Sequence, residues 1–105
     1  MSYRNRRLLD LAHRLNECTA QIEGVCEGYS NHGLEPAHSN QQRHGKGMGN
    51  KADDVFHAAM CHSCHAEIDQ GKMLSKDERR DVWQRAHERT LLEYFKRGWL
   101  RVDFL

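Results

Sequence analysis

Apolar residues near the N-terminus recur with the period of an α-helix. The positions i, i+3, i+4 and i+7 of this pattern are Leu8, Leu11, Ala12 and Leu15. Such spacing places the four side chains on one helix face. The pattern therefore predicts a helix from about Asn5 to Asn16, with its apolar face packed on the core.

A second, longer helix is predicted in the C-terminal third of the chain. The segment Ser75-Lys76-Asp77-Glu78 has the Ser-x-x-Glu form of a capping box, which marks the start of a helix. We expect this amphipathic helix to end near Arg97, before Gly98. The aromatic residues at helical spacing, which we expect to be core residues, are Trp83, Tyr94 and Phe95.

Two extended segments are predicted between these helices. One lies around Glu35 to Ser39, and the other, Asp54 to Met60, is apolar and partly alternating. Together they predict a hairpin with a long loop, in which His57 faces solvent. A short helix is expected to follow over His65 to Asp69, with Gly71 as its C-cap.

The tail of the chain also alternates between apolar and charged residues. Its apolar positions are Leu100, Val102 and Phe104, which predict a final strand. The whole pattern predicts an α+β fold, a hairpin plus helix flanked by an N-terminal and a long C-terminal helix. At 105 residues, we expect residues 1–105 to form a single domain.

The composition indicates that the domain needs a cross-link, by disulfides or by a metal ion, to be stable. Only 38% of the residues are apolar, and a domain of this size buries a modest core. Because no apolar run reaches the length of a signal peptide or a membrane span, we expect a cytoplasmic protein without membrane contact. In a reducing cytoplasm, paired cysteines favour metal over disulfides. The two pairs, Cys18/Cys26 and Cys61/Cys64, therefore predict a structural zinc site.

Positive charge is unevenly distributed, although the formal net charge is only +1. No acidic residue lies between positions 35 and 53. The basic residues of this glycine-rich stretch are Arg43, Lys46 and Lys51. Because glycines let backbone amides approach an anion, we predict that this loop contacts nucleic-acid phosphates. A second cluster is equally well explained as a phosphate contact or as a solvated helix face: Arg4, Arg6, Arg7 and Arg14.

The predicted hairpin and helix bring three polar side chains toward one point. His38 ends the first strand, Asp54 opens the second, and His65 begins the short helix. A neutral imidazole such as His38 can take a proton from water at physiological pH. Asp54 and His65 can hold a divalent ion that acts on a phosphate oxygen. Asp69 lies four residues after His65, on the same helix face, and is a further candidate ligand.

At these residues the sequence resembles the HNH, or ββα-metal, endonucleases, and more narrowly the small prophage-encoded nucleases of the YbcO type. The resemblance covers the chain from about Leu8 onward. It rests on Cys18 and Cys26, on Ala37-His38, on Asp54 seven residues before Cys61, and on Cys61-x-x-Cys64-His65-x-Glu67-Ile68-Asp69. It implies a treble-clef or ββα-metal fold and metal-dependent hydrolysis of nucleic acid, with DNA as the expected partner.

The resemblance also implies roles for individual residues. His38 would be the general base, and His65 a ligand of a catalytic ion such as Mg²⁺, Mn²⁺ or Ni²⁺. The four cysteines would hold the structural zinc. Two positions depart from the pattern: Asp54 stands where these enzymes usually have asparagine, and Ala37 where many have a metal-binding Asp or His. The ion would then need a substitute ligand from among Asp54, Asp69 and Glu35.

Two other interpretations remain at this stage. A zinc-stabilised module that binds nucleic acid or a partner protein without cleaving it would carry the same cysteines and basic residues. The segment Cys61-His62-Ser63-Cys64-His65 also matches the attachment pattern of c-type haem, but that interpretation requires an export signal and leaves Cys18 and Cys26 unexplained. The sequence does not specify the form of the nucleic acid, the catalytic ion or the oligomeric state.

Overall fold

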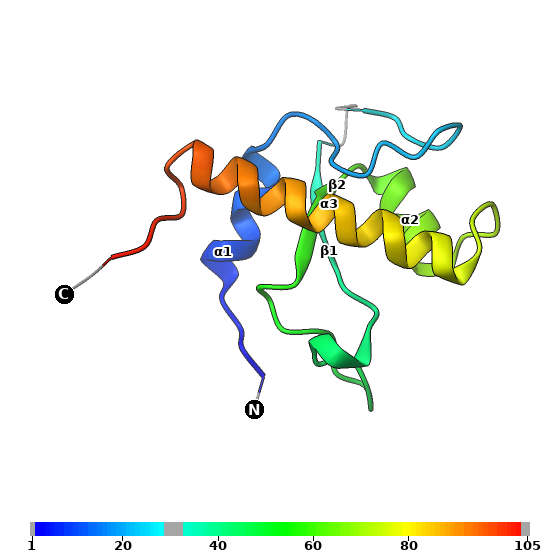
Figure 1. Cartoon of the computed structure of the whole chain (residues 1–105), viewed down its shortest axis with the longest axis horizontal. Coiled ribbons are helices and arrows are strands. Elements are labelled where there is room, and N and C mark those ends of the chain that lie inside the picture. The colour runs from blue at the N-terminus through cyan, green and yellow to red at the C-terminus, as the bar shows by residue number, and fades with distance from the viewer. Residues whose placement is uncertain (1, 29–32, 104–105) are drawn as a thin grey trace.

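The computed structural model describes residues 2–28 and 33–103. Figure 1 shows the elements in space. In chain order they are α1 (Arg6–Asp10), the 3-10 helix η1 (Leu11–Arg14), β1 (Glu35–His38), the 3-10 helix η2 (Gln42–His44), β2 (His57–Met60), α2 (His62–Gln70) and α3 (Lys76–Lys96). This is the α+β arrangement that the sequence predicts.

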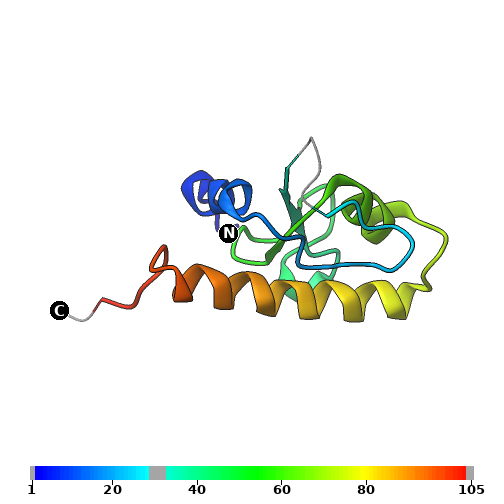
Figure 2. The ribbon, with the colours of Figure 1, turned by 90° about the horizontal axis from the view of Figure 1, so that it is seen from above.

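The hairpin and the helix that follows it position the candidate catalytic residues. Strands β1 and β2 pair antiparallel, with Glu35 opposite Met60 and His38 opposite His57. All four residues of β2 are buried, because α3 packs on this strand and η1 also contacts it. In Figure 2, α3 runs along one side of the molecule, with α1, α2 and the hairpin on the other. The predicted hairpin is therefore confirmed, with strands shorter than expected.

Helix α3 begins where its capping box predicts. The Glu78 amide donates to Ser75 Oγ at 3.1 Å, and the Ser75 amide donates to Glu78 Oε1 at 2.8 Å. Trp83 and Tyr94 are buried as expected. Phe95 is 47% exposed, so its assignment to the core was wrong. Neighbouring residues on a helix point about 100° apart, and here Tyr94 faces the core.

The other helices follow the sequence pattern with shifted boundaries. The predicted N-terminal helix divides into α1 and η1, and Asn5 caps α1 by accepting the Leu8 amide at 3.1 Å. Helix α2 begins three residues before the predicted start, because the Cys61 side chain accepts the Cys64 amide as an N-cap.

Gly71 ends α2 for a reason that the sequence does not reveal. Its backbone is extended, with φ −75°, so left-handed freedom is not required there. Instead, the carboxylate of Glu67 folds back and accepts the amides of Met73 and Leu74, both at 3.0 Å. A Cβ on Gly71 would lie 2.0 Å from Glu67 Cδ. A side chain at position 71 would therefore displace the Glu67 carboxylate from the amides of Met73 and Leu74.

The predicted C-terminal strand is not formed over the described part of the tail. Leu100 is part-buried, but residues 101–103 are exposed and lie outside any strand. Phe104 lies outside the described residues. Within residues 2–28 and 33–103, none of the helices combines the length and apolar character required to span a membrane.

His57 is fully buried, which corrects the prediction that it faces solvent. Because β2 is covered on both faces, alternation along the strand does not identify an exposed side. Nδ1 of His57 donates to the Asp54 carbonyl at 2.7 Å, and Nε2 accepts the Tyr94 hydroxyl at 2.9 Å. Both ring nitrogens are thus satisfied in the neutral form, and burial lowers the pKa of His57 to about 4.

We predict that His57 remains neutral in the folded protein at about pH 5.5, where an ordinary histidine is mostly charged. Its stabilising contribution is fully present above about pH 6.5 and is lost as the pH falls toward the folded-state pKa. Titration of the ring nitrogens by NMR would show the Nδ1–H tautomer. Tyr94→Phe, which removes a donor to the neutral ring, should raise this pKa, and protonation of wild-type His57 near pH 6.5 would contradict the assignment.

Candidate metal centre and active site

The four cysteines converge from two distant segments. Cys18 and Cys26 flank an irregular turn in which Ile22 O accepts the amides of Val25 and Cys26. Cys61 and Cys64 lie at the start of α2. All four sulfur atoms lie within 4.8 Å of one another, and the sulfurs of Cys26 and Cys61 are 3.9 Å apart. Tetrahedral zinc–thiolate bonds of about 2.3 Å imply sulfur separations of about 3.8 Å.

Backbone amides donate to three of the sulfur atoms. Cys18 Sγ accepts the Cys61 amide at 3.3 Å, and Cys26 Sγ accepts the Gly28 amide at 3.3 Å. Cys61 Sγ accepts the amides of Glu27 and Cys64 at 3.4 and 3.5 Å. A hydrogen bond from the Cys64 thiol lowers the pKa of Cys18. Burial nevertheless raises the pKa of Cys26, and the hydrogen bond with Cys18 raises that of Cys64. The sulfurs, their spacing and these amide donors fit a Cys₄ zinc site.

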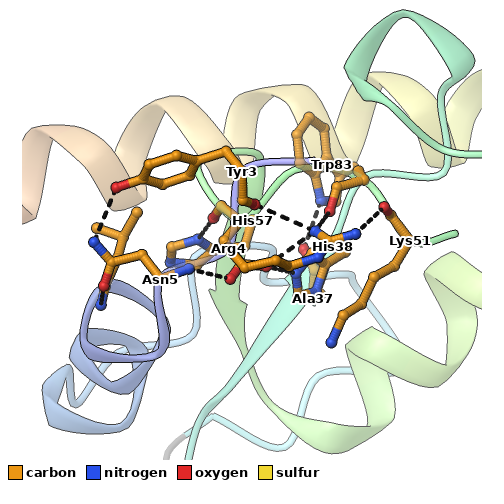
Figure 3. Close-up of polar contacts among 11 residues, drawn as sticks. Tyr3, Arg4, Asn5, Ala37, His38, Lys51, His57 and Trp83 are labelled. Carbon is orange, nitrogen blue, oxygen red and sulfur yellow. Dashed lines mark hydrogen bonds and ion pairs between the residues drawn. The ribbon is translucent and has the colours of Figure 1, made fainter. Parts of the chain in front are cut away.

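His38 and Asp54 form a second polar group on the opposite end of the hairpin from α2. His38 Nε2 and Asp54 Oδ1 are 2.9 Å apart. Asp54 is only 2% exposed and also accepts the Asn5 amide at 2.6 Å and the Arg4 guanidinium at 3.3 Å. Figure 3 shows the N-terminal segment carrying Arg4 and Asn5 against His38. Sequence reasoning identified Asp54 but missed the two N-terminal partners.

The charge of Asp54 is retained despite its burial. Burial alone would raise the pKa of this carboxyl group, but hydrogen bonds from His38 and the Asn5 amide, together with the charge of Arg4, lower it overall. Arg4 is itself held by carbonyl oxygens, at 2.6 Å from Ala52 and 2.8 Å from Lys51. Asp54 is therefore an ionised partner that fixes the ring of His38.

A third polar group forms around His65 on α2. Its Nε2 lies 3.1 Å from Asp69 Oδ2, as their i, i+4 spacing predicts, and its Nδ1 contacts the carboxylate of Glu35 on β1. Asn40 donates to the other Asp69 oxygen at 2.9 Å. Hydrogen bonds that the His65 ring donates to the carboxylates of Asp69 and Glu35 raise the pKa of His65 against the opposing effect of burial. All three side chains stay partly accessible, at 23% for His65, 33% for Glu35 and 43% for Asp69.

The structure thus brings the predicted residues together in two pairs. His38 meets Asp54, and His65 meets Asp69. Neither His38, Asp54 and His65 nor Glu35, His65 and Asp69 form a set with ligand atoms within 4.8 Å, since over the described residues the cysteines are the only group that meets this criterion. Glu35, which the sequence suggested only as a substitute ligand, is the third member of the His65 group.

The predicted phosphate-binding residues occupy two places. Arg43 and Lys46 line a cleft beside Asn40 and Gln41. Lys51 lies at the Arg4 contact through its carbonyl oxygen and has an exposed side chain. In the arginine-rich N-terminal cluster, Arg14 stacks over Trp99 at 4.4 Å from the ring centroid, so part of that cluster has a structural use.

Comparison with known proteins shows a similarity of fold to a solved structure. No protein-family model matches the chain, and no curated protein matches it. One solved structure, described as a "putative bacteriophage protein" from Escherichia coli str. K-12 substr. MG1655, is similar with a TM-score of 0.65. The match covers 85% of this chain and 98% of that chain at 24% identity. At this identity, the likeness concerns the fold alone.

We predict that the purified protein binds one zinc ion per chain and that Cys64→Ser weakens this binding by at least about 100-fold, because binding of structural zinc is coupled to folding. Ser63→Ala, between the two cysteines of the same turn, is the matched control and should keep the metal. Zinc content by mass spectrometry and thermal unfolding check both variants. Equal zinc content and melting temperature in Cys64→Ser and wild type would rule out the four-cysteine site.

Proposed function

We propose that this protein is a metal-dependent endonuclease that hydrolyses phosphodiester bonds of nucleic acid, with DNA as its expected substrate, on a zinc-stabilised ββα-metal fold. One observation carries the proposal: the single strand β1 holds a member of each polar group, Glu35 beside His65 and Asp69, and His38 beside Asp54. The order β1, β2, α2 supports it, as does the similarity to a bacteriophage protein.

His38 is the proposed general base. When Asp54 accepts the Nε2 proton, Nδ1 is the basic nitrogen of the ring and can take a proton from an attacking water. The buried carboxylate keeps this tautomer and stabilises the imidazolium that forms. Because the pKa of Asp54 is lowered, the carboxylate remains charged at neutral pH. Asp54 is thus a positioning residue for the base in this mechanism, rather than an ion ligand.

His65 and Asp69 are the proposed ligands of the catalytic ion, on the Nε2 side of the ring, and Glu35 contacts the opposite nitrogen, Nδ1, and orients the ring. One imidazole and one carboxylate, completed by water and substrate oxygens, suit Mg²⁺, Mn²⁺ or Ni²⁺, and both side chains are partly accessible. A divalent ion bound there would polarise a phosphate oxygen and stabilise the leaving oxygen. Asn40 holds Asp69 in place through its 2.9 Å hydrogen bond. In this proposal the carboxylate of Asp69 replaces the ligand that is missing at Ala37.

We predict cleavage of DNA by the zinc-loaded protein after addition of Mg²⁺, Mn²⁺ or Ni²⁺. His38→Ala should lower the rate by roughly 100- to 10,000-fold, the usual contribution of general-base catalysis, without loss of zinc. His65→Ala should also lower the rate and raise the ion concentration needed. A gel assay on plasmid, linear duplex, single-stranded and branched DNA, with RNA in parallel, measures these effects.

Gln70→Ala is the matched control, because Gln70 is an exposed residue on the same helix as His65. It should cleave nearly as fast as wild type. If the wild-type protein binds nucleic acid but cleaves none of these substrates with any of the ions, the catalytic proposal is wrong and the chain is a binding module. Equal rates for His38→Ala and wild type would exclude His38 as the base.

A further inference from the structure

A basic cleft lies between the loop that follows β1 and the first turns of α3. Two adjoining cavities of about 200 and 720 Å³ form it. Both cavities are lined by Asn40, Gln41, Lys76 and Arg80. Asp69 and Arg79 line the smaller cavity, and Arg43 and Lys46 the larger one. Because Asp69 also contacts His65, the cleft opens directly beside the proposed ion ligands.

Most of the positive charge of this cleft has no ion-pair partner among the described residues, although the charge of Lys46 acts on Asp69. Five cationic residues line it: Arg43, Lys46, Lys76, Arg79 and Arg80. Over the described ranges, none of them has a carboxylate within 4.0 Å. The Nε atom of Arg79 is buried and has no hydrogen-bond partner among these residues. Asp69 is the one acidic residue in the cleft lining.

Both walls of the cleft are anchored to the core. On the helix wall, Lys76, Arg79 and Arg80 have the i, i+3, i+4 spacing of one helix face. One turn further along, Trp83 is buried and donates to the Ala37 carbonyl of β1 at 2.9 Å. This bond fixes the helix wall against the strand that carries His38 and Glu35.

The loop wall is held by His44. Its ring stacks on Phe56 with centroids 4.2 Å apart, and its Nδ1 lies 2.6 Å from Ser39 Oγ. The His44 carbonyl accepts the Asp53 amide at 2.9 Å. The loop that presents Arg43 and Lys46 is therefore tied back to the base of the hairpin.

We propose that this cleft binds the backbone phosphates of the nucleic-acid strand that the enzyme cleaves, with Lys76, Arg79 and Arg80 of α3 as contacts in addition to Arg43 and Lys46. The inference rests on the proposed function and extends it by assigning the path of the substrate beside His65 and Asp69. Unpaired cations on two fixed walls match a polyanion that passes between them. Gln41, Asn40 and the half-buried Arg79 side chain supply hydrogen-bond donors for phosphate oxygens.

The test is a salt titration of binding by the zinc-loaded full-length protein without other added divalent ions. The probes are a short fluorescein-labelled duplex DNA and its single strand. The double variant Lys76→Gln/Arg80→Gln should weaken binding at least about tenfold at low salt, because each lost phosphate contact reduces counterion release. The slope of log K against log salt should fall by about 1.8 for duplex or about 1.4 for single-stranded DNA.

Arg6→Gln/Arg7→Gln is the matched control, since it removes the same charge from exposed positions on α1. Its binding slope should remain that of wild type. Arg43→Gln/Lys46→Gln, on the loop wall, should reproduce the loss seen with the helix variant. Zinc content and far-ultraviolet circular dichroism confirm that each variant is folded.

The outcomes separate the cleft from the catalytic proposal. If both cleft variants lose binding and the wild-type protein cleaves nothing with any ion, the assignment of the cleft stands. The proposal of nuclease activity is then wrong. If cleavage depends on His38 but the binding slopes of the cleft variants are unchanged, the assignment of the cleft is wrong. The proposal of nuclease activity then stands. Equal losses in the α1 control and the cleft variants also overturn the cleft, because the effect is then one of net charge.

Discussion

The meeting of four cysteine sulfurs is the constraint on which the rest of this structure depends. Four thiolates within 4.8 Å of one another repel unless a cation or protons neutralise them. The cluster joins the turn at residues 18–26 to the junction of β2 and α2. Next to it, Thr19 binds the Ala59 carbonyl through both its amide and its hydroxyl. The position of His65, one residue after Cys64, follows directly from this junction.

Local signals in the sequence predict much of the fold. The capping box at Ser75 sets the start of α3, and the extended segments around Glu35 and Met60 pair as expected. The predictions that were wrong concern features that depend on tertiary packing. His57 is buried because β2 is covered on both faces, and Phe95 is exposed because its neighbour Tyr94 fills the core. A tail of alternating residues forms a strand only where a neighbouring strand can pair with it, and residues 101–103 have none.

In the candidate site too, contacts set by local geometry could be predicted, whereas contacts between segments distant in sequence could not. The pairs His38/Asp54 and His65/Asp69 follow from hairpin and helix geometry, and the structure contains both. The contact of Glu35 with His65 was harder to predict, because it depends on how α2 lies beside β1. The α3 cations were missed, since Lys76, Arg79 and Arg80 in a helical segment are typical of a solvated face. Only the position of the loop opposite them shows that they line a cleft.

The contact between Arg4 and Asp54 joins residues fifty positions apart, and it changes what counts as the smallest working unit. A fragment reduced to the hairpin and α2 would lack both Arg4 and the Asn5 amide. Asp54 would then be a buried carboxylate with a single partner, and it would tend to take up a proton. The ring of His38 would lose its charged neighbour in the same event. The short segment before α1, outside the hairpin–helix unit, thus belongs to the proposed active site as much as to the scaffold.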